Sequence, residues 1–307
     1  MDRSGSDDVP VPEGWTPIQL GLVRSAQLFP SMYDVHGVRM SVISGRSRIV
    51  NGLDLGPSFN LSDASHGLQG GFSNYVETEG WGLQASFANF VGQGHVDDGY
   101  SGLQVAGFSN SGSADGIQLA GYVNGWMPKL GKPFVDGDIR GLQIAGVFNG
   151  AKSVAGVQVA AGNAASEGLS GLQVGGINLA FSPDAPGHIE GLQVVAAANI
   201  AGDIRGLQIA GAFNGAKSVA GVQVAAIINE SDGFSALQVG GVNVVDNRID
   251  TCSGVQVGAV NATGIASFCV QLGVINMVDR GSGVQFGLWN SNPDGFLPYF
   301  PILNFSF

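Results

Sequence analysis

The side chains of this chain that can do chemistry are few, and their spacing indicates no reactive centre. Four histidines stand in unrelated contexts, and none has another histidine or a cysteine at metal-ligand spacing. They are His36, His66, His95 and His188. We interpret them as exposed residues of connecting segments. No convergence of Ser, His and Asp is indicated either. We therefore predict that the protein is not an enzyme and has no catalytic, cofactor-binding or metal site.

The acidic residues suggest one metal chemistry, which is calcium binding. Several of them fall in connecting segments, at Asp97, Asp98, Asp136, Asp138, Asp184, Asp246 and Asp250. Carboxylates aligned along one edge of a repeat structure would supply the oxygen ligands that Ca²⁺ prefers. Their spacing is irregular, however, which is more typical of acids that solvate turns.

Charge and hydropathy bear on possible partners and anchors. The chain has 13 Lys and Arg against 24 Asp and Glu, a net charge of -11. Nucleic-acid binding needs concentrated positive charge, so we expect no nucleic-acid partner. The chain contains no run of 18 apolar residues, so we expect no transmembrane helix. The opening residues, MDRSGSDDVPVPEG, contain no apolar core of a signal peptide.

The elements that must position these residues come from an internal repeat. From Gly67 onward, a Gly-apolar-Gln triplet recurs in steps of about 15 residues, with longer steps that indicate insertions. Its glutamines are Gln69, Gln84, Gln104, Gln118, Gln143, Gln158, Gln173, Gln193, Gln208, Gln223, Gln238, Gln256, Gln271 and Gln285. Weaker copies begin at Pro17, Gly37 and Gly52. Arg39 replaces the Gln in the copy at Gly37, and Asp54 replaces it in the copy at Gly52.

Residues 137–161 occur again at 202–226 with one change, Val147 to Ala212. This segment spans two successive units. Duplication of such a block is tolerated where each unit contacts mainly its neighbours, as in a solenoid.

The period within a unit predicts strands. GLQIAGVFN alternates Leu142 and Ile144 on one face with Gln143, Ala145 and Val147 on the other. We expect Leu142, Ile144 and the later Val154 to point inward and the other face to point outward. Gly, together with Asn149 and the small residues after it, is expected to form corners with positive φ.

These patterns favour an all-β fold, a β-solenoid or β-roll of about 15-residue coils with capped ends. Like residues then lie above one another, and the glutamines form an amide ladder on the wall. The predicted ladder comprises Gln143, Gln158, Gln173, Gln193, Gln208, Gln223 and Gln238. The alternative is a closed antiparallel β-barrel with one strand per repeat, whose lumen would be expected to carry charges that the repeat lacks.

The repeat also divides the chain. Residues 1–16 form a predicted N-terminal tail, 17–66 degenerate repeats and an N-terminal cap, 67–290 the regular array, and 291–307 an aromatic C-terminal cap. Cys252 and Cys269 are separated by slightly more than one period, which puts them on neighbouring coils. A disulfide between them and two buried thiols are both open from the sequence.

The run of GLQIAGVFN, GVQVGAVN and GVQFGLWN units, followed by PYFPILNFSF, resembles the bacterial surface-repeat proteins of spirochaetes and Bacteroidetes over roughly residues 17–307. The resemblance implies a cell-envelope or extracellular location and a role that is largely uncharacterised, with no catalytic residues to transfer.

The expected function is accordingly that of a non-enzymatic envelope or surface repeat protein, acting as a rigid scaffold, adhesin or assembly subunit. An outer-membrane β-barrel channel or pore is the alternative. The stripe of uncharged, partly apolar residues that faces outward predicts a partner surface. We expect self-association into a homo-oligomer, with a membrane or a surface ligand as further possibilities.

Overall fold

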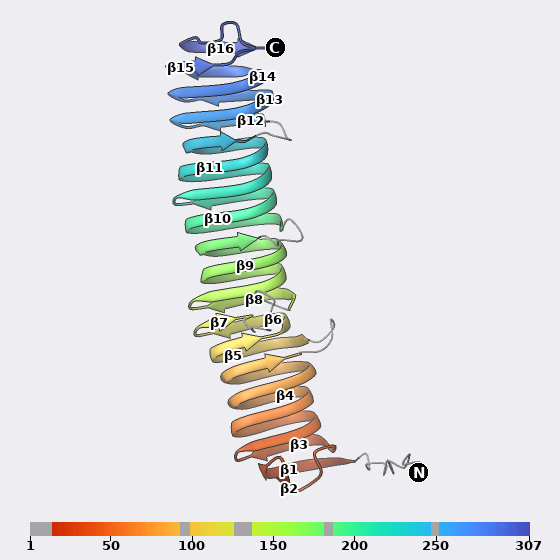
Figure 1. Cartoon of the computed structure of the whole chain (residues 1–307). Coiled ribbons are helices and arrows are strands. Elements are labelled where there is room, and N and C mark those ends of the chain that lie inside the picture. Colours follow the sequence, from red (N-terminus) through yellow and green to blue (C-terminus); the bar gives the residue numbers. More distant parts are fainter. Residues whose placement is uncertain (1–13, 93–98, 126–136, 181–186, 247–251) are drawn as a thin grey trace, which may run out of the picture. The chain divides into compact units, whose positions relative to one another are not determined.

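The computed structural model describes residues 14–92, 99–125, 137–180, 187–246 and 252–307. These residues form an all-β protein with two compact units, Met1–Ala120 (unit 1) and Gly121–Phe307 (unit 2). Each unit is a β-solenoid, in which the chain winds through successive coils (Figure 1). Among the described residues, no helix is long and apolar enough to cross a lipid bilayer.

Several strands are long because they continue around more than one coil. The strands of unit 1 are β1 (Trp15–Val23), β2 (Ala26–Gln27), β3 (Asp34–Ser41), β4 (Ser44–Val91), β5 (Gly99–Ser111) and β6 (Ser113–Ala120). Those of unit 2 are β7 (Val123–Asn124), β8 (Ile139–Ala145), β9 (Phe148–Ala180), β10 (His188–Ala210), β11 (Phe213–Val245), β12 (Cys252–Val257), β13 (Val260–Leu272), β14 (Ile275–Gly287), β15 (Trp289–Ser291) and β16 (Ile302–Ser306).

Neighbouring coils run parallel and in register. In unit 2, β10 pairs with β11 so that Gln208 lies beside Gln223, its equivalent in the next repeat. Gln193 lies beside Gln173 although an insertion lengthens the repeat between them, so the chain returns to the same register after the insertion. In unit 1, β3 pairs with β4 in the same way. This arrangement confirms the β-solenoid prediction. The antiparallel barrel alternative is wrong, because like positions of consecutive repeats stack in the same direction.

Antiparallel strands cover the outermost coils. In unit 1 the short strand β2 pairs antiparallel with β1. In unit 2 β16 turns back and pairs antiparallel with β14, from Gly283 beside Ser306 to Gly287 beside Ile302. An uncovered edge would offer free N–H and C=O groups to another chain. The reversed strands therefore oppose extension of the parallel stack at these two coils.

The corner of most coils lies at a glycine two residues before the Gln, a position taken by Ala236 before Gln238 and by Cys269 before Gln271. Gly206 has a φ of +150°, and a Cβ added there would lie 2.0 Å from the carbonyl oxygen of Gly191. A side chain is strained in this conformation and at this approach of two backbones, so glycine is favoured at the corner, although Ala236 adopts a φ of +138° at the equivalent position before Gln238. The predicted corner at Asn149 is wrong. Asn149 and Gly150 lie within strand β9, and neither has positive φ.

The interior of the coils contains amide side chains, small apolar side chains and a column of larger ones such as Ile189 and Ile204. The amides stand in the first strand of the repeat, whose predicted orientation is therefore reversed. Gln143 is fully buried and Ala145 is buried, whereas Ile144 is 39% exposed and Leu142 is half-buried. Leu142 and Ile144 therefore point outward. Val154 is buried and Val147 is exposed, and both orientations agree with the prediction. Alternation with a period of two separates the faces of a strand without telling which face is inside.

Candidate functional site

Buried glutamines form a continuous chain of hydrogen bonds inside unit 2. The Nε2 group of each glutamine donates to Oε1 of the glutamine one coil earlier, over distances of 2.6 to 2.9 Å. The chain contains Gln143, Gln158, Gln173, Gln193, Gln208, Gln223, Gln238, Gln256, Gln271 and Gln285. The predicted ladder residues therefore do lie above one another, but within the coils and not on an outer wall. A primary amide has donors and an acceptor, so identical neighbours satisfy one another without water.

A second amide ladder runs through the same interior. Asn214 Nδ2 donates to Asn229 Oδ1 at 2.9 Å and also to the carbonyl oxygen of Val224 on the next coil. The asparagines before and after it repeat this pattern, for example Asn199 with Asn214 and Asn229 with Asn243. Each Asn thus ties a side-chain ladder to the backbone of its neighbour. The ladder is interrupted before Asn199, whose Oδ1 has no hydrogen-bond partner among the described residues. On either side of this break, the amide networks hold adjacent coils in one register.

In unit 1 an ion pair continues the glutamine column. Arg39 and Asp54 occupy the Gln positions of consecutive coils and are fully buried. Arg39 Nε donates to Asp54 Oδ1 at 2.7 Å, and Gln69 Nε2 donates to Asp54 Oδ2 at 2.9 Å. From the sequence, both residues were seen only as replacements of Gln, and their pairing was not predicted. Their opposite charges, one period apart in the sequence, could have predicted this ion pair.

The outward positions on either side of each Gln form a surface that we call the apolar wall. Counting the corner glycine as position 1, it consists of positions 2, 4, 6 and 7 of each coil. In unit 2, Ile144 and Val147 are 39% and 42% exposed there, and Ile177 and Ile227 are 46% and 56% exposed. Position 6 is mostly Gly or Ala in this unit, for example Gly146. Small residues at position 6 stand between branched residues at positions 4 and 7, which leaves shallow hollows in the wall.

The described charged residues of unit 2 gather on a different surface, the polar wall, at positions 10 to 15. Lys152 and Glu167 of successive coils approach to 3.5 Å, and Arg205 and Glu190 to 3.6 Å. These groups are largely exposed, so each pair adds little to stability. The outer surface of the coils is therefore amphipathic: one side carries branched apolar residues without charge, and the other carries charges of both signs.

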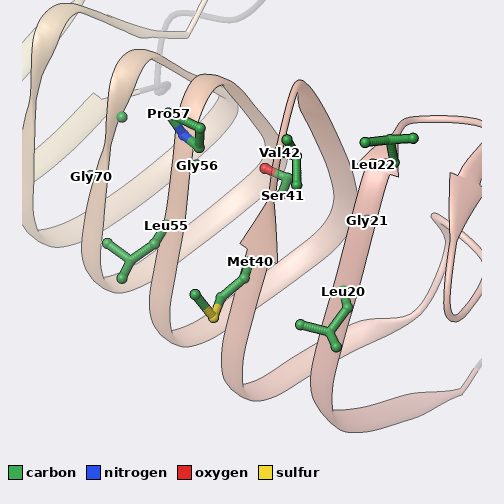
Figure 2. A pocket seen from close by; sticks show the side chains of 11 residues that line it. Leu20, Gly21, Leu22, Met40, Ser41, Val42, Leu55, Gly56, Pro57 and Gly70 are labelled. Atoms are coloured by element: carbon green, nitrogen blue, oxygen red, sulfur yellow. The ribbon is translucent and has the colours of Figure 1, made fainter.

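An apolar groove lies on the outer surface of unit 1, with a volume of about 770 Å³ (Figure 2). Its two sides are formed by residues of successive coils, Leu20, Met40 and Leu55 at position 4 and Leu22, Val42 and Pro57 at position 6. Between them lies the backbone of position 5, which is Gly21, Ser41 and Gly56. Ser41 Oγ, the one side-chain hydroxyl of the lining, donates to Asn60 Oδ1 at 3.1 Å. The groove thus offers apolar contact and no unpaired side-chain donor.

Aromatic residues extend the outer surface of unit 1 along the coils. Phe72 stacks on Phe87 with ring centroids 5.0 Å apart, and Phe87 on Phe108 at 5.5 Å. All three are substantially exposed. Stacks of this kind need the same residue type one period apart, which the parallel register supplies.

The structure brings two of the histidines close to one residue. Asn51 lies between His36 and His66, with contacts to the two Nδ1 atoms of 3.3 and 2.6 Å, and His66 stacks on Trp81. The separation of the two histidines by two periods was the signal for this arrangement. In unit 2, His188 Nε2 lies 3.7 Å from Glu190 Oε1. These three histidines lie within strands, so their interpretation as residues of connecting segments is wrong, and His95 lies outside the described residues.

The acidic residues considered as calcium ligands are only partly described. Asp138 accepts a hydrogen bond from Ser153 at 2.7 Å, and Asp246 is exposed. The others lie outside the described residues: Asp97, Asp98, Asp136, Asp184 and Asp250. Within the described part of the chain, no group of three or more His, Cys, Asp or Glu side chains could hold a metal ion.

Cys252 and Cys269 form a disulfide between neighbouring coils of unit 2, with their Cα atoms 5.8 Å apart. Both are fully buried. The small offset beyond one period is absorbed by a register shift between β12 and β13. Of the two possibilities that the sequence left open, the structure has the bridge.

Comparison with protein-family models, with curated proteins and with solved structures found no significant match for this chain.

Proposed function

We propose that this protein is a non-enzymatic repeat protein of the bacterial cell envelope or cell surface, and that it acts as a rigid scaffold, adhesin or assembly subunit. Its working surface is the apolar wall, and its amide ladders keep that wall in a fixed shape.

The observation that carries the proposal is that amides bonded to one another run through the interior of unit 2. From Gln143 to Gln285 the glutamine amides are buried and bonded to one another. Side chains committed to such a network have no substrate to contact and no freedom to move. The interior therefore supports stiffness, and any binding has to occur on the outer surface of the coils.

The disulfide supports the proposed location. Structural disulfides persist in oxidising compartments such as the periplasm and the cell surface, and are rare in the reducing cytosol. Cys252 and Cys269 are buried, which protects their bond from exchange with external thiols. The resemblance to bacterial surface-repeat proteins supports the same location independently.

The proposal is tested in the source bacterium with an antibody raised against the purified chain. We expect the antibody to stain intact cells, and we expect Cys252 and Cys269 to be oxidised when thiols are trapped with a maleimide before lysis. A cytosolic protein used as a control should be stained only after permeabilisation. Staining that requires permeabilisation, together with reduced cysteines, would contradict the proposed location.

The scaffold role is tested with the purified protein by limited proteolysis under native conditions. We expect the described coils of unit 2 to resist cleavage at protease concentrations that degrade ordinary exposed loops. Rapid cleavage within β9 to β11 would show that the ladders do not make these coils rigid.

A further inference from the structure

The apolar wall of unit 2 points to a specific partner, and we propose that a second copy of this chain packs on it, wall against wall, in a two-fold symmetric dimer. This inference rests on the proposed scaffold function and names the partner of its working surface.

The area of the wall is the first argument. Strands lie about 4.8 Å apart and advance about 3.3 Å per residue, so the stretch from position 2 to position 7 of one coil covers about 80 Å². Unit 2 contains ten described coils with the Gly-apolar-Gln motif or its close variants, with glutamines from Gln143 to Gln285. The wall then covers about 800 Å², which is what each partner of a standard protein interface buries. The largest apolar patch of a typical monomer is smaller, about 300 to 600 Å².

The relief of the wall is the second argument. Its backbone groups are used in the hydrogen bonds between coils, so a partner has to pack by side chains, as two stacked sheets do. Glycine or alanine at position 6, as at Gly176 and Ala226, leaves hollows beside Ile177 and Ile227. A copy of the same wall has projecting branched residues at the spacing of these hollows. A two-fold pairing buries both walls and stops at two copies.

The position of the antiparallel strands is the third argument. β16 covers the edge of β14, so the stack of unit 2 does not grow by adding a further coil there. Association by strand pairing at that coil is opposed, whereas lateral association is not. The charges of the polar wall, such as Lys152 and Glu167, lie away from the contact and remain solvated.

Charge argues against a lipid surface as the partner. Proteins that lie on membranes usually carry Lys and Arg around the inserted face, which meet anionic headgroups. The described residues of unit 2 contain nine Asp and Glu and five Lys and Arg. An acidic surface of this kind is repelled by anionic lipid, but it does not oppose pairing of two uncharged walls.

The test uses the full chain and two matched pairs of substitutions. Ile177→Lys with Ile227→Lys places two charges on the apolar wall, at positions 46% and 56% exposed. Ser170→Lys with Ser235→Lys places the same charges at exposed positions of the polar wall. Mass is measured by sedimentation equilibrium without detergent, and folding by circular dichroism and the melting temperature.

We expect the wild type and the serine variant to have twice the chain mass of 31.4 kDa. We expect the isoleucine variant to be a folded monomer, with a dimer dissociation constant raised at least about a hundredfold, because each charge would be buried without a partner. A monomeric wild type, or equal dimerisation of both variants, would overturn the inference.

A second measurement decides between a copy and a lipid. The proteins are floated with vesicles of phosphatidylcholine and with vesicles that also contain phosphatidylglycerol. We expect no flotation of the wild type with either. Flotation of a monomeric wild type that the isoleucine substitutions abolish would overturn the dimer in favour of a membrane surface. Either failure leaves the surface staining and the oxidised cysteines unaffected, so it is distinguishable from failure of the proposed function.

Discussion

Replacement of one ladder glutamine by glutamate gives a pH-dependent measure of the buried amides. Gln208 Nε2 donates to Gln193 Oε1 at 2.8 Å, and its Oε1 accepts from Gln223 Nε2 at 2.9 Å. In the Gln208→Glu variant a protonated carboxyl group can make both bonds, because its hydroxyl donates and its carbonyl oxygen accepts. An ionised carboxylate can only accept, and it would place a charge in a dry interior.

The magnitude follows from the cost of keeping that carboxyl group protonated. The unfolded chain has a Glu pKa of about 4.3, and one pH unit corresponds to about 1.36 kcal/mol. Folding of Gln208→Glu therefore costs about 4 kcal/mol relative to wild type at pH 7.5 and about 1.6 kcal/mol at pH 5.5. Because the folded pKa is raised, the loss grows as pH rises above 4.3 and is nearly absent below it.

The assay is urea unfolding at pH 5.5, 6.5 and 7.5, with each variant compared with wild type at the same pH. These values stay above the isoelectric point of about 4.5, where solubility is lowest. Ala220→Glu is the control, because Ala220 is exposed on the polar wall of the same coil. If both variants depend on pH equally, Gln208 is not in a buried ladder and the reasoning is refuted.

Three further changes test other parts of the structure. Tyr100→Phe should leave stability at pH 7 unchanged or raised, because the Tyr100 hydroxyl is buried without a hydrogen-bond partner among the described residues. Burial raises the pKa of Tyr100, so the wild type should lose stability as pH rises above 10, and the variant should lose less. Equal losses of both proteins in urea titrations would contradict the burial of the Tyr100 hydroxyl. Replacing Cys252 and Cys269 by Ala should lower the free energy of unfolding by about 3 kcal/mol for a loop of this length, and backbone hydrogen exchange should become faster only in β12–β14. Faster exchange throughout unit 2 would show that the coils do not depend on their immediate neighbours alone. Gly206→Ala should lower the melting temperature sharply and Gly107→Ala only slightly, since an added Cβ lies 2.0 Å from a carbonyl oxygen at the first site and 3.4 Å from a ring carbon at the second; similar melting temperatures would contradict the corner geometry.

The period was the most informative feature of the sequence. Gln143 and Gln158 lie one period apart, and a short repeat with strand alternation leads directly to parallel coils in which they stack. The caps are less predictable. β16 reverses direction on β14, which the aromatic and proline-rich composition of the C-terminus suggested only as some form of closure.

The inside and outside of the coil were not predictable by the rule that apolar residues are buried. A coil this short encloses little space, and Ile144 projects from it while Gln143 fills it. The rule fails because nearly every buried amide meets an identical amide one coil away, which satisfies its polar groups; the exceptions among the described residues are the side-chain oxygens of Asn199 and Gln285. A signal was present: position 3 is Gln in every clear repeat, whereas position 2 varies among Leu, Val and Ile.

The position of the Gln and Asn amides is tested most directly by hydrogen exchange of their side-chain NH₂ groups. The protein is labelled with ¹⁵N in Gln and Asn only and transferred to D₂O, and the NH₂ signals are followed by NMR. For the amides of Gln143 to Gln285 and of Asn199 to Asn276, we expect signals that persist for hours. Loss of these signals within the first minutes, at the rate of a free amide, would show that the amides face water and would contradict the buried ladders.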